Sequence, residues 1–171
     1  MSESEPVASP MPNGAIVVGV DGSDTADHAV AWAARYATLE DRPLVIAHAF
    51  GAIGEADAAG LHLDGGAFAI IYKQLHAGGE AVVAAATRKV AESHPSIGMT
   101  TVVEDGDPRQ LLLRLAERAS LVVMGSRGRG PFRSLVFGSV TAAVAGRAGC
   151  PVVVIPPNDD RDGEPPTRST S

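Results

Sequence analysis

Short runs of apolar residues alternate along this chain with segments whose apolar residues recur at helical spacing. A run without polar interruption is typical of a strand that is buried on both faces of a sheet. Five such runs predict strands at residues 15–20, 44–50, 99–104, 121–124 and 151–155. Because helical segments separate them, we expect an α/β fold with an open, five-stranded parallel sheet and helices on both faces.

Two of the intervening helices have clear signals at their amino-terminal ends. Ser23 or Asp24 can cap the first helix, and Asp107 followed by Pro108 suits the start of the third. Apolar residues at i, i+3 and i+4 spacing then predict one buried face on each helix. For the first helix this face is Ala26, Ala29, Val30, Ala33, Ala34 and Ala37, and for the third it is Leu111, Leu112, Leu115 and Ala119.

The other two helices are predicted from spacing and from stop signals. The second has Leu75, Val82, Val83, Ala86 and Val90 on one stripe. Gly78 and Gly79 weaken its first part, and His94–Pro95 ends it. The last helix begins near Ser139 and has Gly149 just past its end.

The segments outside these elements are predicted to be a long loop and two tails. Residues 51–66 are rich in glycine and alanine and read as a loop between the second strand and the second helix. Residues 1–13 and 158–171 are polar or proline-rich and cannot add to a core. The 171 residues therefore predict one folded domain at 14–157.

Charge and composition narrow the classes of partner. The formal net charge of −6 counts against a nucleic-acid-binding module, which usually has a basic face. No apolar run has the roughly 18 residues of a membrane span, and the first residues lack the positive start of a secretory signal. Cys150 is the single cysteine, which excludes an internal disulfide and favours a reducing compartment. We expect a cytoplasmic protein without nucleic-acid or membrane partners.

The most distinctive chemistry lies in residues 125–139, which follow the fourth predicted strand. Several glycines and the arginines Arg127, Arg129 and Arg133 directly precede the last helix. Glycine allows the backbone to approach a phosphate closely, and a helix start adds partial positive charge and free N–H groups. Arginines add charge-assisted hydrogen bonds. The pattern predicts an anion-binding site at the end of this strand.

The glycine spacing of this loop resembles the ATP-binding signature of the universal stress protein family. That signature is G-2x-G-9x-G-S, here Gly125, Gly128, Gly138 and Ser139. The segments at 16–23 (IVVGVDGS), 104–108 (EDGDP) and 150–155 (CPVVVI) are similar to further parts of the family. The resemblance extends over about residues 14–157. It implies the strand order 3-2-1-4-5, with the order reversing between the first and fourth strands.

The resemblance also implies an ATP site in the crevice between these two strands, with Mg²⁺ assisting. Asp21 would hold the adenosine part, Met124 and Gly125 would lie near the ribose, and the helix start at Ser139 would help to cradle the phosphates. The implied binding residues are Gly19, Val20, Asp21, Ala49, Met124, Gly125, Ser126, Arg127, Gly128, Arg129, Gly130, Gly138, Ser139 and Val140.

A regulator is favoured over an enzyme. Phosphoryl transfer needs a carboxylate that holds magnesium and a residue that positions the nucleophile, whereas Asp21 is committed to adenosine in this interpretation. The histidines show no metal-ligand spacing, and no metal-binding residues are predicted. The expected function is a nucleotide-dependent sensor or regulator of the stress response. A slow ATPase or phosphotransferase, a domain that binds AMP or cyclic AMP, and an interaction domain without nucleotide remain alternatives.

The last predicted strand, Pro151 to Ile155, would lie at the edge of the sheet in this order. Its apolar side chains include no charge that would discourage pairing, so an uncovered edge would be prone to aggregation. Pairing with a second copy around a two-fold axis would give hydrogen-bond partners to the backbone N–H and C=O groups of this edge. Universal stress proteins commonly dimerise through their last strand, and the resemblance therefore implies a homodimer.

Overall fold

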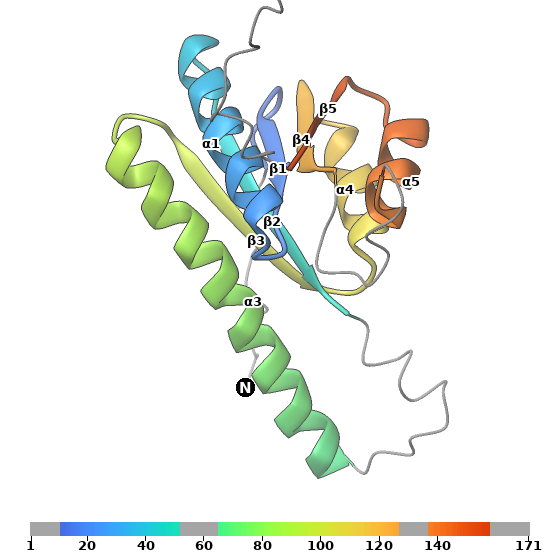
Figure 1. The fold of residues 1–171 in the computed structure, drawn as a ribbon. Helices are drawn as coiled ribbons and strands as arrows, with labels where there is room; N and C mark the ends of the chain where they lie inside the picture. Colours follow the sequence, from blue (N-terminus) through green and yellow to red (C-terminus); the bar gives the residue numbers. More distant parts are fainter. Residues whose placement is uncertain (1–10, 52–64, 127–136, 158–171) are drawn as a thin grey trace, which may run out of the picture.

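The computed structural model describes residues 11–51, 65–126 and 137–157 of the chain. Within them, five strands form one parallel sheet (Figure 1). They are β1 (Ile16–Gly19), β2 (Leu44–Phe50), β3 (Met99–Asp105), β4 (Leu121–Gly125) and β5 (Val152–Ile155). The order β3-β2-β1-β4-β5 confirms both the α/β class and the predicted strand order.

The described helices cover both faces of this sheet. They are α1 (Asp24–Leu39), α3 (Gly65–Ser93), α4 (Pro108–Ala116) and α5 (Ser139–Arg147). α1 and α3 pack on one face, and α4 and α5 pack on the other (Figure 1). In β1, Val18 belongs to the first core and Val17 to the second, and both are fully buried. Burial on both faces explains why the strands read as continuous apolar runs.

α1 begins at the predicted cap. Ser23 adopts an extended conformation, and its Oγ accepts a hydrogen bond from the Ala26 N–H at 3.3 Å. The whole predicted face of the helix is buried. Because five of its six residues are alanine, the helix can lie close to the sheet without large side chains between them.

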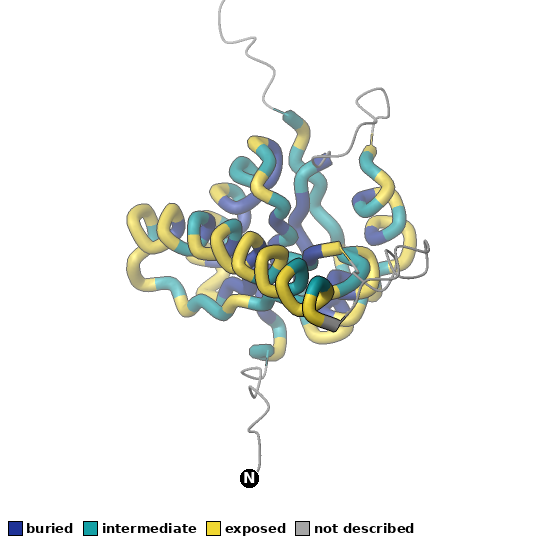
Figure 2. Tube along the Cα trace, turned by 90° about the horizontal axis from the view of Figure 1, so that it is seen from below, coloured by how far each residue is buried: buried dark blue, intermediate teal, exposed yellow. Residues whose placement is uncertain are grey.

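α3 differs from the prediction at its amino-terminal end. It is one continuous helix of 29 residues, and it includes both glycines that were expected to weaken it. Leu75, predicted on the buried stripe, is 40% exposed, because the first turns of α3 run beyond the end of the sheet (Figure 1). Further along, Val83, Ala86 and Val90 are buried as predicted. Figure 2 shows buried residues gathered in the strands and exposed residues along the outer sides of the helices.

Several boundaries differ from the sequence prediction by a residue or two. Gly149 follows α5, but the helix ends at Arg147 and Ala148 already leaves it in an extended conformation (φ −62°, ψ 140°). Residues 52–64 of the predicted loop and almost all of both predicted tails lie outside the described residues. None of the helices in the described part combines the length and apolar character that crossing a bilayer requires.

Candidate functional site

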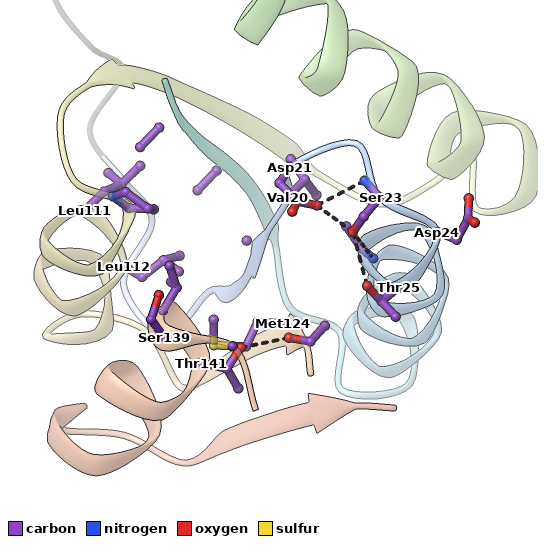
Figure 3. A pocket seen from close by; sticks show the side chains of 18 of the residues that line it. Val20, Asp21, Ser23, Asp24, Thr25, Leu111, Leu112, Met124, Ser139 and Thr141 are labelled. Atoms are coloured by element: carbon purple, nitrogen blue, oxygen red, sulfur yellow. Dashed lines mark hydrogen bonds between the residues drawn. The ribbon is translucent and has the colours of Figure 1, made fainter. Parts of the chain in front are cut away.

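A cavity of about 540 Å³ opens at the carboxyl ends of β1 and β4 (Figure 3). The helix that follows β1 covers one face of the sheet and the helix that follows β4 covers the other, so a crevice forms where the two connections diverge. Its volume is typical of small-molecule sites. It is lined by Gly19, Val20, Asp21, Ser23, Asp24, Thr25, Ala26, Ala47, Ala49, Pro108, Leu111, Leu112, Met124, Gly125, Gly138, Ser139, Val140, Thr141 and Pro157.

The turn between β1 and α1 places a carboxylate at the edge of this cavity. Asp21 Oδ1 accepts hydrogen bonds from the Ser23 N–H at 3.0 Å and from Ser23 Oγ at 2.6 Å. Gly22 between them has φ +75°, a conformation that other residues rarely adopt. Ser23 Oγ also lies 3.1 Å from Thr25 Oγ1. The half-buried carboxylate of Asp21 is therefore held in a fixed orientation.

The opposite wall of the cavity is apolar and comes from α4. Pro108, Leu111 and Leu112 line it, and Leu112 packs directly over Gly19. A Cβ on Gly19 would lie 3.1 Å from Leu112 Cδ1, so the missing side chain makes room for this leucine. Ala47, Ala49 and Met124 extend the apolar surface along the sheet. This part of the cavity suits a flat, largely apolar ring.

The start of α4 is closed by its own side chains. Asp107 is the N-cap, and its Oδ1 accepts a hydrogen bond from the Arg109 N–H at 2.8 Å. The Arg109 side chain also donates to both carboxylate oxygens. These side-chain hydrogen bonds hold the pKa of Asp107 below its usual value, against the smaller opposing effect of burial.

The start of α5 is open by comparison. Gly138 is its N-cap, in an extended conformation, and no side-chain hydrogen bond within the described residues caps the helix. Gly138 N–H donates to the Ser126 carbonyl at 2.8 Å. Thr141 Oγ1 donates to the Gly125 carbonyl at 2.9 Å (Figure 3). These bonds hold the first turn of α5 beside the cavity.

The three helix starts around the cavity therefore differ in what they offer an anion. Each supplies lining residues, and each has the partial positive charge of a helix amino terminus. At the starts of α1 and α4, the side chains of Ser23 and Asp107 already accept hydrogen bonds from backbone N–H groups of the first turn. The charged residues among the described lining are Asp21 and Asp24, both acidic and both beside α1. The uncapped start of α5 is consequently the place where the described cavity best accommodates a phosphate or another anion.

The structure brings most of the predicted site residues together around this cavity. Nine of them line it: Gly19, Val20, Asp21, Ala49, Met124, Gly125, Gly138, Ser139 and Val140. Ser126 is buried nearby without lining the cavity, and its hydroxyl has no hydrogen-bond partner among the described residues. Arg127, Gly128, Arg129 and Gly130 lie outside the described residues, so their predicted contacts stay predictions.

Sequence reasoning missed ten of the lining residues, of which Leu111, Leu112 and Thr141 are the most informative. Leu111 and Leu112 were assigned to the core because a periodic pattern does not distinguish packing against a sheet from lining a cavity. Their place near the start of a helix that follows a strand was the available signal, since such helix starts gather at one edge of a parallel sheet. Thr141 was missed as well, although a threonine beside the inward-facing Val140 and Val144 was a visible irregularity in the pattern.

His48, in β2, has a structural role. Its Nδ1 lies 2.7 Å from the Val20 carbonyl oxygen, which can only accept, so Nδ1 carries the proton. The side chain thereby satisfies a carbonyl just past the last residue of β1. The described residues contain no cluster of three or more histidine, cysteine, aspartate or glutamate side chains that could hold a metal ion.

Comparison with known proteins identifies relatives over almost the whole described chain. A model of the universal stress protein family matches residues 12–156. The universal stress protein Rv3134c of Mycobacterium tuberculosis is 34% identical over 163 residues, which cover 95% of this chain and 55% of that protein. Rv2623 of the same organism is 32% identical over 139 residues, which cover 81% and 44%. The chain thus spans about half the length of these curated relatives.

Solved structures agree on the fold. The universal stress protein UspA from Lactobacillus plantarum has a TM-score of 0.64 at 21% identity, over 85% of this chain and 99% of that one. A universal stress protein in complex with cAMP has a TM-score of 0.58 at 28% identity, over 84% and 96%. A member of the family from Arabidopsis thaliana with AMP bound has a TM-score of 0.57 at 18% identity, over 86% and 94%.

Proposed function

This chain belongs to the universal stress protein family, and we propose that it binds an adenine nucleotide in the cavity between β1 and β4. The observation that carries the proposal is the uncapped start of α5, which meets a largely apolar cavity at the switch point of the sheet. An apolar slot beside an anion site has the chemistry of a nucleobase joined to phosphate.

In this proposal the two ends of the nucleotide bind to different elements. The base lies against the wall formed by Leu111 and Leu112, and the Asp21 carboxylate accepts a hydrogen bond from the adenosine part. The phosphates lie at Gly138, Ser139 and Val140, the lining residues at the start of α5, whose backbone N–H groups donate to them. Arg127 and Arg129, which follow β4 directly in the sequence, supply positive charge. Gly128 and Gly130 leave room for the phosphates.

We propose ATP, with Mg²⁺ bound to its phosphates, as the physiological ligand. The support is the complete G-2x-G-9x-G-S spacing, which ends at the start of α5. Cyclic AMP is the second candidate, because the solved relative with cAMP bound shares 28% of its residues with this chain. AMP is a third candidate.

We further propose that the nucleotide regulates this protein in the stress response and is not the substrate of efficient catalysis. Fast phosphoryl transfer needs a carboxylate that is free to hold magnesium. Asp21 is engaged with Ser23, and Asp24 begins α1 beside it. Single-turnover hydrolysis of ATP should therefore run far below the roughly 1–100 s⁻¹ of kinases, and a rate in that range would establish an enzyme instead.

Two variants test the site by separating the two ends of the nucleotide. Calorimetry should show that Gly138→Val weakens ATP and AMP at least about tenfold, because a side chain there occupies phosphate space. Asp21→Ala should weaken adenosine, AMP and ATP by similar factors, because all three share the adenosine part. The nucleotide that co-purifies with the wild-type protein, identified by mass spectrometry, decides between the candidate ligands.

Gly146→Val is the matched control for the glycine variant. Gly146 lies in the last turn of the same helix, and a Cβ there meets no described atom within 4 Å. Circular dichroism confirms that each variant is folded. A folded Gly138→Val protein with wild-type affinity for ATP would place the nucleotide elsewhere and contradict the proposal.

A further inference from the structure

We infer that Thr141 is the positioning residue of the phosphate-binding end of the cavity. Its hydroxyl fixes the first turn of α5 against the end of β4, so that the helix amides face the ligand. The inference deepens the proposed function and rests on it. It concerns a residue that the glycine signature does not contain.

Thr141 joins two elements that are far apart in the sequence. The residue is 3% exposed, and its Oγ1 donates a hydrogen bond of 2.9 Å to the carbonyl of Gly125, the last residue of β4. A second bond runs from the Gly138 N–H to the Ser126 carbonyl at 2.8 Å. The start of α5 is thus tied to two consecutive carbonyl groups at the end of the strand.

The direction of this hydrogen bond differs from that of Thr38 and Thr87, two other threonines within helices. Thr38 and Thr87 each donate to the carbonyl four residues earlier in their own helix, both at 2.9 Å. Threonine hydroxyls within helices commonly make this bond. Thr141 instead reaches a carbonyl sixteen residues away on a neighbouring element. Its hydroxyl therefore connects two elements, whereas those of Thr38 and Thr87 act within one helix.

Such a connection matters because α5 cannot fix its own orientation. The helix has nine residues, too few to be stable alone, and no described side chain caps its start. Its first amides can bind a phosphate only while they face the cavity. The β-branched side chain of Thr141 has few accessible rotamers, and that stiffness makes its hydrogen bond an effective constraint.

The strand end cannot move to compensate. A Cβ on Gly125 would lie 3.0 Å from Thr25 Cβ and 3.1 Å from the Thr25 backbone carbon. β4 is therefore already packed against α1, and the Thr141 hydroxyl bonds to a carbonyl that is fixed on its other side. Loss of that bond should displace α5, not β4.

The test compares adenosine with AMP, which differ only by the phosphate. Calorimetry on Thr141→Val should show AMP affinity reduced about tenfold, the order expected when a buried carbonyl loses its hydrogen bond. Adenosine affinity should change less than about threefold, and Thr141→Ser should restore AMP binding because serine keeps the hydroxyl. Thr87→Val removes an equivalent hydroxyl far from the cavity and should bind both ligands like wild type.

The outcomes separate the two proposals. AMP affinity that is unchanged in Thr141→Val, or reduced equally with that for adenosine, overturns the role of Thr141 while nucleotide binding stands. Wild-type protein that binds neither AMP nor adenosine contradicts the proposed function, and the role of Thr141 fails with it. Thr141→Ala removes the same hydroxyl and decides the question if the valine variant does not fold.

Discussion

Gly78 and Gly79 are neighbours in α3 with opposite surroundings. A Cβ on Gly78 would meet nothing within 4 Å, whereas a Cβ on Gly79 would lie 2.9 Å from His48 Cδ2 and 3.0 Å from Val103 Cγ1. The His48 ring cannot easily move away, because its Nδ1 is bonded to the Val20 carbonyl at 2.7 Å. At Gly79, α3 therefore lies against β2 and β3 without room for a side chain.

We predict that alanine has opposite effects at these two positions. Gly78→Ala should raise the free energy of unfolding by about 0.5–1 kcal/mol, since alanine favours the helix. Gly79→Ala should lower it by about 1–3 kcal/mol, since the added methyl group overpacks the contact with the sheet. Urea denaturation of the two single variants measures both values. An increase in stability for Gly79→Ala would show that α3 can move outward at little cost.

The sequence predicts such residues only in part. Glycine within a helical pattern indicates a weak helix, and nothing local to the sequence distinguishes Gly79 from Gly78. The difference depends on which strands lie beneath α3. The apolar face of α1 could be predicted in full because periodicity and burial coincide there, whereas Leu75 was placed wrongly because its helical turn has no sheet to pack against.

At the scale of elements, the start of α4 gives a prediction that depends on pH. Asp107 caps the helix, and hydrogen bonds from the Arg109 side chain lower its pKa. A carboxyl group whose pKa is lower in the folded state stabilises the fold above its unfolded pKa of about 3.9, and this contribution is lost as the pH falls further.

We therefore predict that the free energy of unfolding falls less steeply at acid pH in Asp107→Asn than in the wild-type protein. Asparagine can still cap the helix, but it has no charge to titrate. The stability difference between wild type and Asp107→Asn should be constant above about pH 5 and should shrink below about pH 4, as Asp107 becomes protonated. Thermal unfolding at several pH values measures it. A difference that grows towards acid pH would show that the ion pair with Arg109 does not lower the pKa.

Helix boundaries were predicted best where a local sequence signal marks them. α1 and α4 start at the residues that their caps indicated, because a capping side chain and its amide are close in sequence. The sequence placed the first two residues of α3 in a loop, because both are glycines at the end of a glycine-rich segment. Gly149 predicted the end of α5 to within two residues. The chain leaves the helix through Ala148 in an extended conformation, however, and not through a glycine with positive φ.

At the scale of the whole molecule, β5 gives a prediction about assembly. It pairs with β4 on one side, and within the described residues no strand covers its other side. Val152, Val153, Val154 and Ile155 are all only partly buried. We propose that a second copy pairs with this edge around a two-fold axis.

Light scattering at micromolar concentration should then give about twice the chain mass of 17.5 kDa. Val153→Lys should weaken the dimer at least about tenfold, because a charge at a buried edge is costly. Leu39→Lys adds the same charge at a residue of α1 that is 76% exposed, and it should leave the dimer intact. A monomeric wild-type protein would contradict the proposal.

The cavity itself was partly predictable at this scale. The strand order and the glycine spacing placed β1, β4 and the start of α5 around one crevice, as the structure shows. The wall from α4 could not be predicted, because the same leucines satisfy a core pattern. Nor could the bond from Thr141 to Gly125, which depends on the distance between two elements and not on any local motif.

The hydrogen bond between Gly138 and Ser126 has a consequence for how this family could diversify. The chain leaves the end of β4 at Ser126 and returns to the same residue at Gly138, so the eleven positions between them begin and end at one anchored point. The described contacts that fix the register of β4 and the start of α5 lie at the two ends of this segment. If the nucleotide binds as we propose, substitutions between these anchors should change which phosphate groups are preferred without moving the anchors, so that ligand preference and folding can evolve separately.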